Sequence, residues 1–186
     1  MTKSRNRENL VTLVTGGSRS GKSTYALKLA ENKVNKVFIA TAEPLDDEMN
    51  ERITDHKRER AGQYLTLEEP VKVWEAIRSV SEEIDVIVLD CLTVWLGNLQ
   101  YHLNDREKED AAVQKLITVL RNPPCEIVVV TNEVGMGIVP ENELSRRFRD
   151  AAGWLNQLVA AVAQKVVLVV SGIPVIIKNE REEIGL

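Results

Sequence analysis

The chain has 186 residues, of which 44% are hydrophobic and 28% are charged, an ordinary globular mixture that excludes a disordered, fibrous or membrane-spanning chain. Its 24 basic and 28 acidic residues give a net charge of -4, so nothing in the overall charge indicates binding to nucleic acid. The two cysteines, Cys91 and Cys125, lack metal-ligand spacing and are expected to be reduced, as in a cytoplasmic protein. Residues 1–9 are expected to form a polar tail without a signal-peptide core, and residues 10–186 a single domain.

Short β-branched runs alternate with longer helical patterns, which predicts an α/β fold with a mostly parallel sheet flanked by helices. The predicted strands are 10–15, 37–40, 86–90, 127–131, 166–171 and 175–178. The predicted helices are 22–32, 46–60, 70–80 with a proline at its start, 105–120 and one after Pro140. The last strand follows its predecessor too closely for a helical crossover, so we expect it to pair antiparallel at the edge.

The helix after Pro140 carries a single apolar stripe at alternating steps of four and three residues, which predicts its buried face. The stripe consists of Leu144, Phe148, Ala151, Leu155, Leu158 and Val162. The three tryptophans, Trp74, Trp95 and Trp154, are expected in the core or at an interface, with a platform for stacking of a ligand as the less common alternative.

The strongest motif is GGSRSGKS at residues 16–23, a complete G-x-x-x-x-G-K-S between a predicted strand and a predicted helix. Its glycines let successive backbone N–H groups point at phosphate oxygens, and the following helix N-terminus adds its dipole. Lys22 is expected to reach the β- and γ-phosphates, and the Ser23 hydroxyl to bind Mg²⁺. The flanking strand and helix disfavour the alternative of a chance glycine-rich turn. The nucleotide-binding residues expected here are Gly16, Gly17, Ser18, Arg19, Ser20, Gly21, Lys22 and Ser23.

Asp90 closes the hydrophobic run VIVLD, at the end of a predicted strand. A P-loop needs an acid near its metal, so we expect Asp90 to bind Mg²⁺ directly or through water. The alternative is a helix N-cap, a common use of aspartate at a strand–helix junction. The P-loop and the acid together predict a nucleoside triphosphate site without indicating what is done with the phosphates.

His56 shares one face of the predicted helix 46–60 with Met49, Ile53 and Arg60. Neighbouring cations disfavour a protonated imidazole, and a neutral histidine can attack phosphorus to give a covalent intermediate. From the pattern alone, a packing or surface role is the more common one. The other histidine, His102, lies in a polar, loop-like stretch and is expected at the surface without a role.

Three blocks then carry a likeness to a known family: GGSRSGKS, then FIATAEPLDDEM with ITDHK, then VTNEVGMGIVPENELSRRFRDAAGWLNQ. In this order they resemble the bifunctional adenosylcobinamide kinase/adenosylcobinamide-phosphate guanylyltransferase, from about Leu10 to Lys178. The resemblance implies a RecA-like P-loop fold and a role in assembling the nucleotide loop of adenosylcobalamin. One reaction phosphorylates adenosylcobinamide with ATP or GTP. The other transfers GMP from GTP to adenosylcobinamide-phosphate and gives adenosylcobinamide-GDP and pyrophosphate.

The same resemblance implies roles for particular residues. His56, the histidine of ITDHK, stands at the position of the family's guanylylated histidine, and Asp90 at that of the acid ending the strand. The resemblance further implies a homotrimer. The charge balance and the lack of a long apolar run predict no nucleic acid partner and no membrane insertion. The further nucleotide contacts that it implies are Thr41, Ala42, Glu43, Lys57, Arg58, Glu59, Arg60 and Glu68. The alternatives are a simple P-loop kinase for a small alcohol, with His56 structural, and a RecA-like ATPase acting on nucleic acid.

Two further groups stay open. Asn132, Glu133 and Gly135 follow a strand at the edge where ligands of parallel sheets gather, and form either a turn or part of a site for the corrinoid or a metal-bound water. A basic cluster lies on the long helix, where a solvated face is the more common explanation and phosphate or subunit contact the alternative. This cluster consists of Arg146, Arg147 and Arg149.

Overall fold

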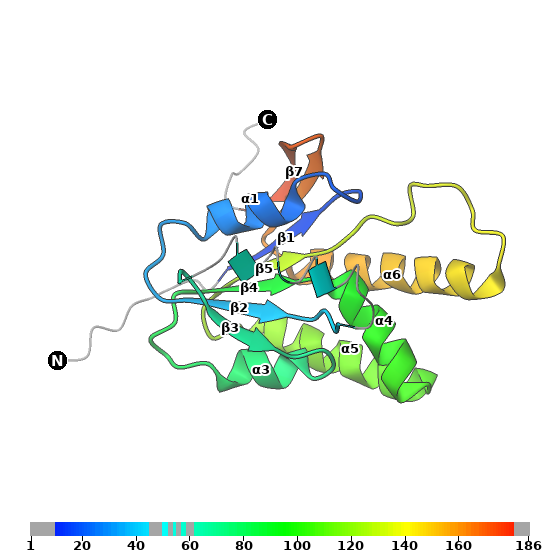
Figure 1. Ribbon diagram of the computed structural model, residues 1–186, viewed down its shortest axis with the longest axis horizontal. Helices are drawn as coiled ribbons and strands as arrows, with labels where there is room; N and C mark the ends of the chain where they lie inside the picture. Colours follow the sequence, from blue (N-terminus) through cyan, green and yellow to red (C-terminus); the bar gives the residue numbers. More distant parts are fainter. Residues whose placement is uncertain (1–9, 45–49, 52–53, 55–56, 59–61, 181–186) are drawn as a thin grey trace.

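The computed structural model describes residues 10–44, 50–51, 54, 57–58 and 62–180. Its strands form one seven-stranded sheet in the order β3-β2-β4-β5-β1-β6-β7 (Figure 1). All neighbouring strands are parallel except β6 and β7, which pair antiparallel at one edge. The strands are β1 (Val11–Thr15), β2 (Lys36–Ala40), β3 (Leu65–Glu68), β4 (Val86–Asp90), β5 (Glu126–Val130), β6 (Lys165–Val170) and β7 (Ile173–Asn179). The predicted α/β architecture, a mostly parallel sheet with a short antiparallel edge strand, is confirmed.

Helices cover both faces of the sheet (Figure 1). The helices are α1 (Lys22–Leu29), α3 (Val73–Ser79), α4 (Leu92–Leu103), α5 (Arg106–Arg121) and α6 (Glu143–Val162). Side chains alternate between the two faces of the sheet along a strand. In β1, Leu13 therefore packs on the face covered by helices α3 to α6, and Val14 packs on the face covered by α1. The described residues between 50 and 58 are also helical, in agreement with the predicted helix 46–60. No helix of the described part of the chain is both long and apolar enough to cross a membrane.

Two elements were not predicted from the sequence. β3 is a four-residue edge strand, and only its pairing with β2 distinguishes it from a loop. α4 begins after Cys91 without a side-chain cap and contains Gly97, so it lacks the usual sequence signals of a helix. The helix predicted from Pro70 begins instead at Val73, and Pro70 lies before it rather than in its first turn.

The predicted apolar stripe of α6 is correct only in part. Leu155 is buried, but Leu144 is 73% exposed and Leu158 is 38% exposed. The buried face is completed by Ala152 and Val159, which lie beside Leu155 on the helix.

Of the three tryptophans, two are buried and one is exposed. Trp74 and Trp95 are buried as expected, with 6% and 0% exposure. Trp154 is 67% exposed, so of the two places expected for it the core is excluded, and an interface stays a prediction.

Candidate nucleotide-binding site

A cavity of about 600 Å³ lies at the carboxyl ends of the parallel strands, where ligands of such sheets bind. Its walls come from the loop after β1, the start of α1 and the residues that follow β2, β4 and β5. Of the residues predicted for the site, those that line the cavity are Ser18, Arg19, Ser20, Gly21, Lys22, Ser23, Ala42, Lys57, Glu68 and Asp90. The structure thus brings most of the predicted nucleotide contacts together.

The P-loop has a backbone that only glycine accommodates at its first position. Gly16 has φ +150°, and a Cβ atom there would lie 2.3 Å from the carbonyl oxygen of Val169 in β6. Gly21 precedes α1 with φ +95°, in the left-handed region. The turn between β6 and β7 supports the loop from behind, because the Gly172 N–H donates to the Ser20 carbonyl at 2.8 Å. These contacts hold the loop in a curled shape.

Lys22 is a buried cation in the first turn of α1, with 7% exposure. Its Nζ donates to the carbonyl oxygen of Gly17 at 2.5 Å. Burial lowers the pKa of Lys22, and the neighbouring Cys91 and Asp90 act against that shift. An anionic ligand in this cavity would offset the cost of burying the ammonium group, which is the chemistry expected of a phosphate-binding lysine.

Ser23 and Asp90, the two residues expected to bind Mg²⁺, both line the cavity. Among the described residues, no group of three or more His, Cys, Asp or Glu side chains is placed to hold a metal ion. Mg²⁺ keeps several waters and binds proteins through one or two oxygen ligands together with substrate phosphates. One hydroxyl and one carboxylate therefore fit Mg²⁺ that arrives with a nucleotide, and do not fit an independent metal centre.

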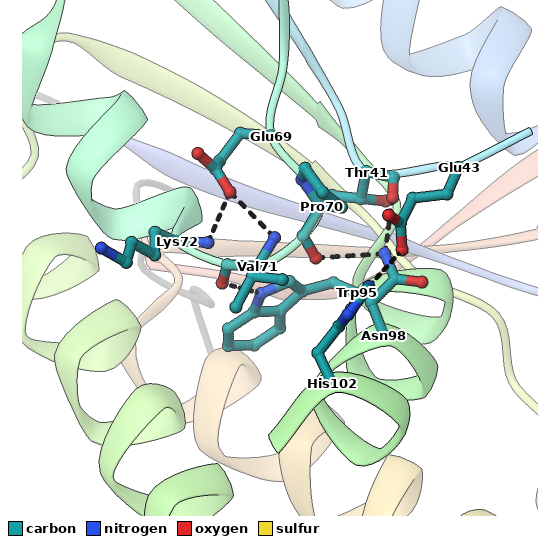
Figure 2. Close-up of polar contacts among 9 residues, drawn as sticks. All are labelled: Thr41, Glu43, Glu69, Pro70, Val71, Lys72, Trp95, Asn98 and His102. Carbon is teal, nitrogen blue, oxygen red and sulfur yellow. Dashed lines mark hydrogen bonds and ion pairs between the residues drawn. The ribbon is translucent and has the colours of Figure 1, made fainter. Parts of the chain in front are cut away.

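The segment after β2 places only part of its predicted contacts in the cavity. Ala42 and Pro44 line it. The Thr41 side chain is fully buried, and its Oγ1 accepts a hydrogen bond from the Cys91 N–H and donates one to the Cys91 carbonyl, both at 2.9 Å. The Glu43 carboxylate is bound by helix α4 (Figure 2). The side chains of Thr41 and Glu43 thus hold this segment in place. Their neighbours Ala42 and Pro44 form its part of the cavity wall.

Helix α4 holds the residues that follow β2 and β3 (Figure 2). The Asn98 side-chain amide donates to the carbonyl oxygens of Thr41 at 2.7 Å and Pro70 at 3.0 Å. The Trp95 indole N–H donates to the carbonyl oxygen of Val71 at 2.7 Å. Because Asn98 is buried, these bonds fix two strand-end segments relative to one helix.

His102 is exposed at the surface, as predicted, but it lies in a helix rather than in a loop and has a partner. It lies in the last turn of α4, and its Nε2 is 2.7 Å from Oε2 of Glu43. Trp95, Asn98 and His102 are spaced by three and four residues, so one face of α4 carries all three contacts. That spacing is the sequence signal that would have located them, but it is informative only once a helix is assigned there.

The remaining predicted contacts come from the helical segment after residue 50 and from β3. Lys57 and Glu68 both line the cavity and form an ion pair with each other, with 2.6 Å between Nζ and Oε1. Arg58 is described and exposed. His56, Glu59 and Arg60 lie outside the described residues.

The two groups left open by the sequence have separate explanations. The carboxylate of Glu133 accepts a hydrogen bond from the Gly135 N–H at 2.9 Å, so these two residues form a turn, whereas Asn132 lines the cavity. On α6, Arg146 donates to the carbonyl oxygen of Pro140 at 3.0 Å, and Arg149 pairs with the neighbouring Asp150. These two arginines thus make local contacts and are half-buried, whereas Arg147 is exposed.

Comparison with known proteins gives consistent results over nearly the whole chain. The model of a family described as cobinamide kinase / cobinamide phosphate guanyltransferase matches residues 12–177. The bifunctional adenosylcobalamin biosynthesis protein CobU of Salmonella typhimurium is 45% identical over 181 residues, which cover 91% of this chain and 100% of the relative. The corresponding protein CobP of Pseudomonas aeruginosa is 41% identical over 169 residues, which cover 90% of this chain and 97% of the relative.

One solved structure agrees in fold. The Pyrococcus horikoshii OT3 protein PH0250 superposes with a TM-score of 0.56 at 10% identity, covering 94% of this chain and 89% of that protein. At this identity the likeness concerns the fold alone.

Proposed function

The chain belongs to the cobinamide kinase / cobinamide phosphate guanyltransferase family, and from this premise we propose that it is a bifunctional transferase of adenosylcobalamin biosynthesis. It phosphorylates adenosylcobinamide with a nucleoside triphosphate, and it transfers GMP from GTP to adenosylcobinamide-phosphate. The observation that carries this proposal is a P-loop cavity that joins Lys22, Ser23 and Asp90, all within the residues matched by the family.

In the kinase reaction, the aminopropanol hydroxyl oxygen of adenosylcobinamide attacks the γ-phosphorus. The bond from that phosphorus to the bridging oxygen breaks, the nucleoside diphosphate leaves with the bonding electrons, and the hydroxyl proton passes to solvent. Lys22 and the backbone N–H groups of the P-loop hold the phosphates and offset the charge that develops on them.

In the guanylyl transfer, a nitrogen of His56 attacks the α-phosphorus of GTP and pyrophosphate leaves. A phosphate oxygen of adenosylcobinamide-phosphate then attacks the same phosphorus, which releases His56 and gives adenosylcobinamide-GDP. Two observations support this role: His56 occupies the family's motif position, and its near neighbours Thr54 and Lys57 line the cavity. The P-loop in this reaction holds the leaving pyrophosphate.

We propose that Ser23 and Asp90 hold Mg²⁺ together with the bound nucleotide, directly or through water. When bound, this ion neutralises charge on the phosphate groups. We also propose that the protein works in the cytoplasm, as its cysteine usage indicates, and that it forms a homotrimer, as the resemblance of the sequence implies; light scattering of the purified protein measures the number of subunits.

The deciding experiment incubates the full chain and Mg²⁺ with GTP labelled in turn at the α- and the γ-phosphate. The chain has two histidines, so His56→Ala is compared with the matched control His102→Ala. We expect protein-bound label from the α-phosphate alone, acid-labile and base-stable, lost in His56→Ala and kept in His102→Ala. A folded, GTP-binding protein without covalent label would refute the guanylyl-histidine and leave the simple P-loop kinase.

A further inference from the structure

The carboxyl end of β5 lies between the P-loop, which follows β1, and Asp90, which ends β4. β5 lies between β1 and β4 in the strand order, and its Val130 is in register with Val14 on one side and Asp90 on the other. The next residue, Thr131, still lies beside β1, because its N–H donates to the Val14 carbonyl at 3.0 Å. Asn132 therefore follows at the one strand end that is flanked by both phosphate-site elements.

The backbone of Asn132 is fixed by side chains from two helices. Its N–H donates to Thr93 Oγ1 of α4 at 2.8 Å, and its carbonyl accepts from Asn156 Nδ2 of α6 at 3.2 Å. Buried Thr131 links these two helices, because its Oγ1 donates to Asn156 Oδ1 at 2.7 Å and lies 3.3 Å from Thr93 Oγ1. A fully bonded polar network of this kind holds a residue in one position.

The P-loop is attached to the same segment. The N–H of Glu133 donates to the carbonyl oxygen of Gly16 at 2.9 Å. The residue before it, Asn132, is therefore fixed relative to the loop that holds the phosphates as well as to the two helices.

The Asn132 side chain is left available for a ligand. It lines the same cavity as Lys22 and Asp90, and its amide makes no hydrogen bond with the part of the chain that the structure describes. An asparagine amide offers two N–H donors and no charge. It can therefore bind a phosphate oxygen beside the carboxylate of Asp90 without adding to the negative charge there.

We propose that the side-chain amide of Asn132 donates a hydrogen bond to the γ-phosphate of the bound nucleoside triphosphate, and that Thr93, Thr131 and Asn156 are its positioning residues. The γ-phosphate is assigned because Asn132 lies between the P-loop, whose Lys22 reaches the β- and γ-phosphates, and the acid at the end of β4. Its effect on the two reactions rests on the proposed function.

The two proposed reactions differ in how much the charge on the γ-phosphate changes, and therefore in how much they depend on the hydrogen bond from Asn132. In phosphoryl transfer, charge spreads over the three equatorial oxygens of the γ-phosphoryl group, so a donor aimed at them stabilises the transition state. In guanylyl transfer the bond that breaks is at the α-phosphorus, and the γ-phosphate leaves unchanged as part of pyrophosphate. Asn132 moves no proton in either reaction, and its loss should therefore slow the kinase reaction more.

The first test measures nucleotide binding and does not depend on any transfer reaction. Affinities for GTP and GDP are measured by calorimetry in the His56→Ala background, where no covalent GMP can form. We expect Asn132→Ala to weaken GTP binding about tenfold or more, the usual cost of losing a hydrogen bond to a charged group, and to change GDP binding less than about twofold. Asn122→Ala, at the end of α5 and before the amino end of β5, is the matched control and leaves both affinities unchanged, because Asn122 does not line the cavity.

The second test measures both reactions with His56 intact. We expect Asn132→Ala to lower kcat for adenosylcobinamide phosphorylation about 100-fold, with KM for adenosylcobinamide unchanged and formation of protein-bound GMP slowed less than about tenfold. Thr131→Val should lower the same kcat, and Thr131→Ser, which keeps the hydroxyl, should restore it. Equal loss of GTP and GDP affinity, equal slowing of both reactions, or a raised KM for adenosylcobinamide would overturn the proposal. A wild-type protein inactive in both transfers would refute the proposed function, and the binding test would still decide the role of Asn132.

Discussion

Thr41→Val tests whether the residues after β2 are held as the structure describes. The Thr41 hydroxyl bonds both the N–H and the carbonyl of Cys91 at 2.9 Å, and the side chain has no exposed surface. Valine has nearly the same shape but leaves the Cys91 N–H without a partner, at about 1–3 kcal/mol, whereas the Cys91 carbonyl still accepts from the Trp95 N–H at 3.0 Å. We expect the free energy of unfolding to fall by about 2 kcal/mol, which lowers Tm by roughly 4–8 °C in a protein of this size.

Urea denaturation with a constant m-value measures this loss, and Thr41→Ser is the matched control. Serine keeps the hydroxyl and removes one methyl group, so it should cost only about 1 kcal/mol. Because the Thr41 side chain does not line the cavity, the serine variant should bind GTP with wild-type affinity. A valine variant less than about 1 kcal/mol below the wild type, or no worse than the serine variant, would refute this reasoning.

Four further predictions follow from single residues. Lys22→Met should abolish the thermal shift caused by GTP without lowering Tm of the free protein, since burial lowers the pKa of Lys22 and disfavours its charged form; differential scanning fluorimetry measures both. Burial and the nearby Asp90 raise the pKa of Cys91 to about 12 from 9.0, so as pH rises through this window the unfolded thiol loses its proton first and stability falls. This fall is at most about 1.4 kcal/mol per pH unit, and urea denaturation of Cys91→Ala should show a shallower slope; an equal slope would count against the buried thiol. Trp154, 67% exposed, should account for most acrylamide quenching of tryptophan fluorescence, so Trp154→Phe should leave a poorly quenched, blue-shifted emission. His102→Ala should lower the free energy of unfolding by less than about 1 kcal/mol in urea, because its contact with Glu43 is partly exposed, and a larger loss would assign that contact a greater structural role.

The sequence predicted best those features that depend on local pattern. β4 was predicted to the residue, and β1 to within one residue, because strands buried on both faces appear as continuous apolar runs. The P-loop could be located from its motif because its chemistry requires fixed residue types at fixed spacing, and six of its eight residues line the cavity. Each of these signals is contained in fewer than ten consecutive residues.

What the sequence could not predict depends on contacts between distant segments. α4 has no capping signal, and the importance of its Asn98 and His102 arises only when β2 and β3 bring their partners to the same face. Asn132 illustrates the same limit. Its position beside the P-loop follows from the placement of β5 between β1 and β4, and strand order is a property of the whole sheet.

The support of the P-loop by β6 and the turn after it has a thermodynamic consequence. Gly16 lies against the carbonyl of Val169, and Ser20 is bonded by Gly172, so the loop takes its shape from the protein rather than from the nucleotide. The conformational entropy of the loop is then lost during folding, and binding a triphosphate does not have to order it again. Association with the nucleotide should accordingly be fast and free of a slow rearrangement step. A substitution near residue 170 should change the affinity for the nucleotide, although the P-loop lies some 150 positions away in the chain.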